Sequence, residues 1–319
     1  MTAMRITLGQ LYPDLMCTYG DRGNVETILR RCGWRGIAAD VIQLRMADRI
    51  RPGDLDLIVI GSGGEAQQAM IASDLAEIKG PGIREAVEQG AAALAVGAGY
   101  ELFGHFCQPG DGPELPGVGL FDAWTVRRHA ALGGHYGTIT EARADRAIGE
   151  VLVRWGDTLL VGFENHSGGT YLGPAAQPLG EVIYGYGNCG DGFEGVLAGG
   201  AVGTHLRGPC LPKNPQLADF LIGAALARRY GQARLRPLPD GLEQAAHEAA
   251  IGRARRAVRR PESRLVRAVL RRPAAGRAPR HHVARGRLRR GQGQRADSRA
   301  MDGAGGGSAG RDLRSGTDW

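Results

Sequence analysis

The first hundred residues alternate between short apolar runs and segments in which apolar side chains recur at helical spacing. The runs predict strands at residues 4–9, 37–44, 55–60 and 92–96. The spacing predicts a helix at 23–33, closed by Gly33, and helical structure at 66–89, which Pro81 breaks into two pieces. Apolar strands that alternate with helices predict an α/β fold with a mostly parallel sheet covered by helices.

After about residue 118 the pattern changes to short strands separated by turns, at 117–126, 147–155, 158–165, 180–187 and 195–206. Residues 129–145 are expected to form a surface excursion. Helical spacing returns at 215–231, where Gly231 can cap the helix, and at 241–258. We therefore expect one α/β domain over 1–240, followed by a C-terminal helix over 241–258.

Beyond residue 258 no periodic pattern remains, and large apolar residues are few. Such a segment cannot bury enough surface to offset its ordering entropy, so 259–319 is predicted to be a disordered tail rich in Arg, Gly and Ala. Residues 251–319 hold 19 Arg, no Lys and 5 acids, a charge of +14. Because the whole chain carries +7, residues 1–250 carry −7.

The arginine-rich tail has two interpretations. It could attract the phosphates of a nucleic acid. It could also be a solvated segment without a selected role, since out-of-frame translation of GC-rich DNA gives a similar mixture. We favour the second interpretation, because basic nucleic-acid-binding tails usually mix Lys with Arg and this one has no Lys.

Composition narrows the class of protein. Hydrophobic residues make up 43% of the 319 positions, yet no apolar run reaches 18 residues, so no membrane span is expected. The start, MTAMRITLGQLYPD, does not resemble a secretion signal. The five cysteines are odd in number and lack CxxC spacing. We therefore expect a cytoplasmic protein without disulfides, metal or cofactor.

The stretch AALAVGAGYELFG, residues 92–104, carries the first chemical signal. It predicts a buried strand, a sharp glycine-rich turn and the start of a helix at Tyr100. This layout is typical of a nucleophile elbow, in which a strained turn presents one reactive side chain. The residue at the tip is Gly97, which has no side chain.

Four longer motifs identify a family. They are LYPDLMCTYGDRGNVETILRR (11–31), GFENHSGGTYLG (162–173), GYGNCGDGFEGV (185–196) and GTHLRGPCLPKNPQLADFLI (203–222). Together they resemble the GatD family, the CobB/CobQ-type class I glutamine amidotransferases that serve as the glutaminase subunit of lipid II isoglutaminyl synthase. The resemblance covers about residues 4–250 and implies a flavodoxin-like class I glutamine amidotransferase fold.

The resemblance also implies a reaction and a partner. In this family a Cys at the elbow attacks the side-chain amide of glutamine, and a His on a later strand acts as base and acid. The released ammonia passes to a MurT-like Mur ligase subunit, which uses ATP to amidate the D-glutamate of lipid II. No GxxxxGK[ST] motif occurs in this chain, so an ATP-dependent step needs that separate partner.

The motifs depart from the family where the chemistry is done. The family elbow reads Cys-x-Gly, and Gly97 stands in the nucleophile position. The family base motif reads Gly-Thr-Tyr-Leu-His-Gly-Pro, and Arg207 stands in the position of the His. Arginine stays protonated and cannot serve as a base. The resemblance therefore implies an amidotransferase subunit whose glutaminase activity is impaired.

The substrate-binding turn is only partly preserved. The family turn Gly-Gly-Gly-Gln-Asp corresponds to Gly61-Ser62-Gly63-Gly64-Glu65. The resemblance implies that backbone N–H groups of Gly63, Gly64 and Ala98 help to hold the substrate and its oxyanion.

Other side chains could replace the missing pair. His205 precedes Arg207 by two residues, and strand alternation would put both on one face, roughly 6–7 Å apart, so His205 is a possible substitute base. Cys107, Cys189 and Cys210 are candidate nucleophiles, although packing is the default role for each.

Several further residues have a candidate role at the pocket. Arg146 matches a family position that can hold the carboxylate of glutamine as a bidentate partner, with Arg127 and Arg128 as competitors. His166 could orient a pocket loop. The segment Asp21-Arg22, together with Asn24, is expected to fix the first turn and cap the helix that follows it.

Two alternative functions stay open besides the impaired glutaminase. The chain could be a non-catalytic scaffold subunit that docks to the ligase, or it could bind nucleic acid through its basic tail. Alteration of the sequence itself, by engineering or error, would also explain the two catalytic losses and the tail.

Overall fold

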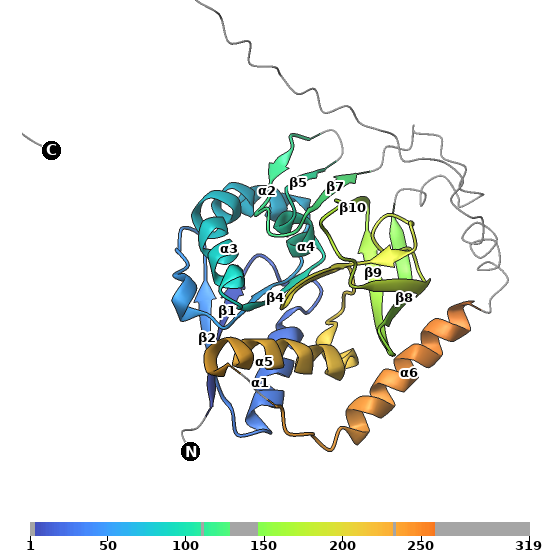
Figure 1. Cartoon of the computed structure of the whole chain (residues 1–319). Helices are drawn as coiled ribbons and strands as arrows, with labels where there is room; N and C mark the ends of the chain where they lie inside the picture. The colour runs from blue at the N-terminus through green and yellow to red at the C-terminus, as the bar shows by residue number, and fades with distance from the viewer. Residues whose placement is uncertain (1–3, 110–111, 128–145, 232–233, 259–319) are drawn as a thin grey trace, which may run out of the picture. The chain divides into compact units, whose positions relative to one another are not determined.

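The computed structural model describes residues 4–109, 112–127, 146–231 and 234–258 (Figure 1). A six-stranded sheet lies at its centre in the order β13-β14-β4-β3-β1-β2. The strands are β1 (Arg5–Leu11), β2 (Ala38–Leu44), β3 (Leu57–Ile60), β4 (Ala92–Val96), β13 (Val196–Ala198) and β14 (Ala201–Thr204). All pairs are parallel except β13 with β14, which confirms the mostly parallel α/β sheet.

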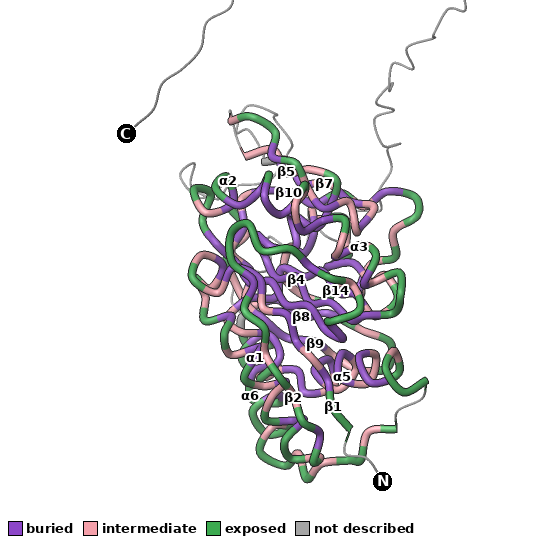
Figure 2. Tube along the Cα trace, turned by 90° about the vertical axis from the view of Figure 1, so that its left-hand side faces the viewer, coloured by how far each residue is buried: buried purple, intermediate pink, exposed green. Residues whose placement is uncertain are grey.

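Helices cover both faces of this sheet (Figure 1). Side chains of β3 alternate between the two sides, so that Leu57 and Val59 pack with α1 (Arg22–Gly33) and α5 (Pro215–Tyr230). Ile58 and Ile60 belong to the opposite core, with α2 (Glu65–Ser73) and α3 (Gly80–Glu88). The central strands are therefore buried on both faces (Figure 2), which explains why they are apolar throughout.

The helical segment predicted at 66–89 changes its helix type in the middle without a gap. A π-helical stretch, η2 (Asp74–Lys79), joins α2 directly to α3. Pro81 lies in the first turn of α3, where a missing N–H is tolerated. The wider η2 turn buries Lys79 against Asp74, whose Oδ2 also accepts the Tyr12 hydroxyl at 2.6 Å. The prediction that Pro81 breaks this segment is wrong, because α2, η2 and α3 follow one another without a gap and the change of helix type lies before Pro81.

The strands between residues 104 and 195 form two further four-stranded sheets. One has the order β10-β7-β5-β6 and contains β5 (Phe106–Gln108), β6 (Leu115–Pro116), β7 (Ala123–Arg127) and β10 (Gly168–Leu172). The other has the order β12-β11-β8-β9 and contains β8 (Ala147–Trp155), β9 (Thr158–His166), β11 (Gly180–Tyr184) and β12 (Phe193–Glu194). The predicted short strands are thus present, while 129–145 and 259–319 lie outside the described residues.

Two helices follow these sheets in the sequence, as predicted. Gly231, with φ +80°, ends α5 by donating its N–H to the Ala227 carbonyl at 2.8 Å. The last helix, α6 (Gly241–Val258), packs against the β8–β9 sheet through Ala250, Ile251 and Ala254. No helix in the described residues is both long and apolar enough to cross a bilayer. Short 3-10 turns, η1 (Pro52–Asp54) and η3 (Leu211–Lys213), complete the connections.

Candidate functional site

The carboxyl ends of β1, β3, β4 and β14 meet at one edge of the central sheet, where parallel α/β folds place their sites. The chain turns sharply at Gly97 between β4 and the short helix α4 (Ala98–Phe103). Gly97 has φ +57° and ψ −116°, a conformation that side-chain-bearing residues rarely adopt. Its N–H donates to the Thr204 carbonyl of β14 at 2.8 Å, which fixes the turn. The elbow geometry predicted from the sequence is therefore present.

The side chain of Arg207 lies directly over the tip of this elbow. A Cβ built on Gly97 would come within 2.6–2.7 Å of Nε, Cζ and Nη2 of Arg207. The backbone of Arg207 is held by Phe163, to whose carbonyl it donates at 2.8 Å. Its guanidinium stands over the Tyr19 ring, with Cζ 4.9 Å from the ring centroid. Arg207 is 4% exposed, and its buried Nε has no hydrogen-bond partner.

Asp21 lies close enough to Arg207 for the two charges to interact. Burial raises the pKa of Asp21 above its usual range, while hydrogen bonds from backbone N–H groups and the Arg207 charge act in the opposite direction. The Asp21 Oδ2 accepts the Ser62 N–H at 3.1 Å, and its buried Oδ1 has no partner. The capping prediction is wrong here, because Asp21 makes no side-chain cap on α1. Asn24 instead accepts the Leu211 N–H at 3.0 Å.

Side chains at and just after the turn that follows β3 accept hydrogen bonds from the backbone N–H groups around it. The Ser62 hydroxyl accepts the Ala98 N–H at 3.3 Å. That N–H is the donor that follows the nucleophile position. The Gly64 N–H donates to Gln67 Oε1 at 3.1 Å. Two of the three backbone groups expected at the oxyanion, those of Gly64 and Ala98, therefore already have acceptors, and a Cβ on Gly63 would overlap Met16 Sδ at 2.7 Å.

His205 lies in the core. The strand β14 ends at Thr204, so the strand alternation on which the prediction for His205 and Arg207 relied does not extend to these residues. The His205 Nε2 contacts the Thr170 hydroxyl at 2.9 Å, and its ring packs edge-on against Tyr100. Burial lowers the pKa of His205 well below its usual range, and the charges of His166 and Arg207 act in the same direction. The imidazole is fully buried and its Nδ1 has no partner.

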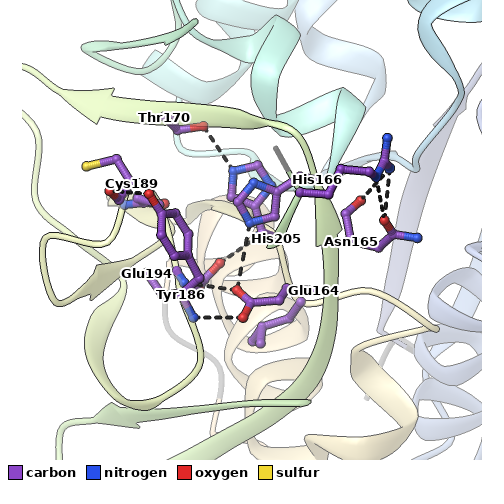
Figure 3. A network of polar contacts seen from close by, with 12 residues as sticks. Glu164, Asn165, His166, Thr170, Tyr186, Cys189, Glu194 and His205 are labelled. Carbon is purple, nitrogen blue, oxygen red and sulfur yellow. Dashed lines mark hydrogen bonds and ion pairs between the residues drawn. The ribbon is translucent and has the colours of Figure 1, made fainter. Parts of the chain in front are cut away.

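His166 stacks on His205 with 3.9 Å between ring centroids and 9° between planes (Figure 3). Its Nδ1 lies 2.8 Å from the Gly168 carbonyl, and its Nε2 lies 3.7 Å from Glu164 Oε2. Glu164 in turn accepts the backbone N–H groups of Tyr186 and Gly187 at 2.7 and 2.9 Å. Glu164 thus ties β9 to the glycine-rich loop at 185–192, and His166 packs beside it.

Two of the three candidate cysteines are buried in packing positions. Cys107 lies in β5 and Cys210 precedes η3, and both are buried. Burial raises the pKa of both thiols far above the usual range, which disfavours the thiolate form. Cys189 is partly exposed, and its carbonyl accepts the Tyr186 hydroxyl at 2.6 Å.

Arg146 is connected to the elbow through two intermediate side chains. Its Nη2 and Nε donate to Asn165 Oδ1 at 2.8 and 3.1 Å. The Asn165 amide then donates to the Tyr19 hydroxyl at 3.3 Å, and the guanidinium of Arg207 stands over the Tyr19 ring. Of the competing arginines, Arg127 ends β7, and Arg128 lies outside the described residues.

Tyr19 and Asn165 were missed from the sequence as parts of the site. Both lie inside the motifs that carry the family resemblance, LYPDLMCTYGDRG and GFENHSGG. Polar and aromatic residues in those motifs are the signal that could have found them. Within the described ranges, no three His, Cys, Asp or Glu side chains are arranged to hold a metal ion.

This arrangement holds a fixed positive charge at the elbow. It offers no thiol or hydroxyl at the tip, and the guanidinium cannot accept a proton. The Cys–His mechanism that the motifs imply is therefore not available to Gly97 and Arg207.

Comparison with known proteins identifies the family of the chain. Residues 7–215 match the CobB/CobQ-like glutamine amidotransferase domain. Over 254 residues the chain is 32% identical to the lipid II isoglutaminyl synthase (glutamine-hydrolyzing) subunit GatD of Staphylococcus aureus strain N315, covering 79% of this chain and 97% of that protein. The GatD subunit of Streptococcus pneumoniae R6 is 31% identical over 234 residues, covering 72% and 83%.

Among solved structures, PurLQS from Thermotoga maritima has a TM-score of 0.39 at 12% identity, covering 70% of this chain and 96% of that one. That similarity is too low to support an argument, and the family assignment rests on the domain match and the two GatD relatives. The chain therefore belongs to the CobB/CobQ-like glutamine amidotransferases and, within them, to the GatD family.

Proposed function

We propose that this chain is a GatD-type amidotransferase subunit that does not hydrolyse glutamine by the Cys–His mechanism of its family. The complex it would serve supplies ammonia to a MurT-like ligase that amidates the D-glutamate of lipid II in the cytoplasm. In this proposal the site keeps its elbow and Arg146, the candidate that would hold the carboxylate of glutamine. It lacks both reacting side chains.

One observation carries the proposal, namely the elbow at Gly97 with Arg207 lying over its tip. A glutaminase needs a nucleophile within reach of the amide carbon and a base within hydrogen-bond distance of that nucleophile. Gly97 has no side-chain atom, and Arg207 has no basic lone pair at neutral pH. His205 is a poor substitute because its ring is fully buried between His166 and Tyr100.

The test is ammonia release from L-glutamine by the chain purified together with a MurT-like ligase. We expect no release above the protein-free control for the natural sequence, and release by the double variant Gly97→Cys, Arg207→His. The matched control is Gly97→Ser, Arg207→His, which restores the base without the thiol. Release by the natural sequence would refute the proposal and direct attention to Cys189, Cys210 and His205.

A non-catalytic scaffold role is a second candidate, favoured by the retention of both apolar cores around a site without its dyad. On this hypothesis the chain docks to the ligase and stabilises it, while free ammonia replaces glutamine. Co-purification of the two proteins, with amidation supported by ammonium salts and not by glutamine, is the expected outcome. Failure of the two chains to associate would exclude this role.

A further inference from the structure

We propose that Arg207 is the internal occupant of the former nucleophile position, so that residues 97 and 207 are a linked pair rather than two independent replacements. The guanidinium fills the volume into which a side chain at position 97 would project. This inference concerns the packing of the chain itself and does not depend on which ligand or partner the protein has.

The contact at the elbow tip is specific to one side chain. The three heavy atoms closest to a Cβ built on Gly97 all belong to Arg207, at 2.6, 2.7 and 2.7 Å. Real Cβ atoms essentially never approach other atoms within 3.0 Å. Gly199 provides the comparison, because it has the same φ of +57° and nothing lies within 4 Å of its Cβ position. A positive φ is common to both positions, whereas the overlap with Arg207 exists only at Gly97.

The end of an arginine side chain is flexible, so the cost of the overlap depends on whether the guanidinium can move away. Its position is confined by the Tyr19 ring at 4.9 Å and by burial of all but 4% of the residue. The Arg207 main chain is bridged to Phe163 through both its N–H and its carbonyl, at 2.8 and 3.4 Å. Moving the guanidinium therefore means leaving the ring and repacking a buried cation.

A second group closes the site beside Arg207. The Ser62 hydroxyl accepts the Ala98 N–H at 3.3 Å, so the donor next to the tip is satisfied inside the protein. Ser62 itself is fully buried. A ligand amide approaching the tip would have to displace both the guanidinium and this hydroxyl. The former pocket is thus filled by its own side chains.

The linkage has a consequence for how the two positions can change. With Gly at 97, an arginine at 207 packs without overlap. With any larger residue at 97, the same arginine must leave its place. An arginine at 207 is therefore compatible with loss of the nucleophile side chain and not with its retention.

A double-mutant cycle tests the linkage by thermal unfolding without ligand. Gly97→Ala is made in the natural Arg207 background and in an Arg207→Ser background, and Gly199→Ala is made in the same two backgrounds. We expect Gly97→Ala to lower the Tm by about 5 °C or more in the natural background, and by half of that or less in the Arg207→Ser background. Gly199→Ala should lower the Tm equally in both. Equal losses for Gly97→Ala in the two backgrounds would overturn the proposal.

Thiol reactivity gives an independent readout if an Arg207→Ser chain does not fold. Gly97→Cys is compared with Gly97→Cys, Arg207→Gln, and alkylation by iodoacetamide at residue 97 is followed by peptide mass spectrometry. At a pH where the thiol is ionised in both variants, we expect the rate to be at least about tenfold higher in the double variant, because the guanidinium no longer covers the thiol. The rate at the partly exposed Cys17 is the internal control. Equal rates at residue 97 would contradict the proposal.

Discussion

At the scale of single residues, Glu194 links the end of β14 to the loop at 185–195. Its carboxylate is fully buried and accepts the His205 N–H at 2.6 Å and the Thr204 hydroxyl at 3.1–3.2 Å. Burial raises the pKa of Glu194 to about 8, because the neutral acid avoids the cost of desolvation, although these hydrogen bonds act in the opposite direction. Between its unfolded pKa and about 8, the folded chain therefore binds more protons than the unfolded chain.

The sign of the pH effect follows from that difference. Where the native state holds the extra proton, the free energy of unfolding falls as pH rises. His205 acts in the opposite direction below about pH 6.5, since its lowered pKa leaves the native imidazole neutral while the unfolded one is charged. As pH rises from about 6.5 to 8 the unfolded imidazole loses its remaining charge, so the contribution of His205 fades. The Glu194 effect is then the one of the two that remains.

We predict that Glu194→Gln flattens the pH dependence of stability in this window. The natural chain should lose roughly 1–2 kcal/mol of unfolding free energy from pH 6.5 to 8, and the variant should lose markedly less. Urea unfolding at several pH values measures both. The exposed Glu181, changed to Gln, is the control and should leave the slope as it was. Parallel pH profiles for Glu194→Gln and the natural chain would contradict the assignment.

At the scale of elements, Asn214 fastens the start of α5 to β9. Its Oδ1 accepts the Val161 N–H at 2.9 Å, and its Nδ2 donates to the carbonyls of Val161 and Cys210 at 2.9 and 2.8 Å. The side chain thus satisfies backbone groups of a strand from a helix start, and all of these residues are buried. Buried backbone groups left without partners cost more than the bond they lose.

Asn214→Ala should therefore lower the free energy of unfolding by about 3 kcal/mol, measured by urea denaturation. Asn214→Asp should not rescue it, because a carboxylate cannot donate to the two carbonyls. The exposed Gln89→Ala, on α3's C-terminal side, should change stability by less than about 0.5 kcal/mol. A cost for Asn214→Ala as small as that of Gln89→Ala would show that the contacts to β9 contribute little.

The elements differ in how far the sequence predicts them. The strand at 92–96 and the helix at 215–230 follow from local pattern, since each has a continuous apolar run or spacing and a glycine at its end. The π-helical turn at Asp74–Lys79 does not follow from local pattern, because Lys79 and Asp74 are buried together against Tyr12 from a distant segment. The end of β14 at Thr204 likewise depends on Glu194, whose carboxylate captures the next N–H.

The same distinction applies to the site. The empty tip at Gly97 and the arginine at 207 can be identified from two motifs, because each position is defined by its neighbours in the chain. The contact between them cannot be identified from the motifs, since it depends on the direction of one long side chain and on the Tyr19 ring. The His166–His205 stack could not be predicted for a similar reason, because it joins β9 to the segment after β14.

At the scale of the whole molecule, one buried arginine joins three segments. Arg31 of α1 is 1% exposed at its side chain and makes paired contacts with Asp219 of α5, at 2.7 and 2.8 Å. It also contacts Asp240 at 2.7 and 2.9 Å, immediately before α6 begins. These bidentate pairs fix the position from which α6 starts.

We predict that Arg31→Ala costs about 3–5 kcal/mol of unfolding free energy, because it leaves the partly buried Asp240 carboxylate unpaired and Asp219 with Arg35 as its remaining partner. The link at 231–240 should also be cleaved several times faster in limited proteolysis, since α6 loses its anchor. The neighbouring Arg30→Ala removes only an exposed pair with Glu26 and should cost less than about 0.5 kcal/mol. Unchanged proteolysis in Arg31→Ala would mean that α6 is held by its apolar face alone.

A truncation after residue 258 tests the tail at the same scale. Among the residues that the structure describes, the three apolar cores draw their members from positions 6–254. Since the sequence predicts a disordered tail, the Tm of the shortened chain should stay within about 2 °C of the full chain. Residues 1–250 carry −7, so binding to DNA at low salt should be lost if the arginines of the tail were its source. DNA binding that survives truncation would refute a tail-based nucleic-acid function.

The groove between α1 and α6 offers an optical signal of these events. Trp34 is 50% exposed and lines that groove together with Leu242 and Ala246 of α6. Trp155 is instead packed edge-on against Phe220, at 5.5 Å between centroids. Release of α6 would change the emission of the first indole while the second stays shielded. Fluorescence of Trp34 can therefore separate detachment of the last helix from melting of the central sheet.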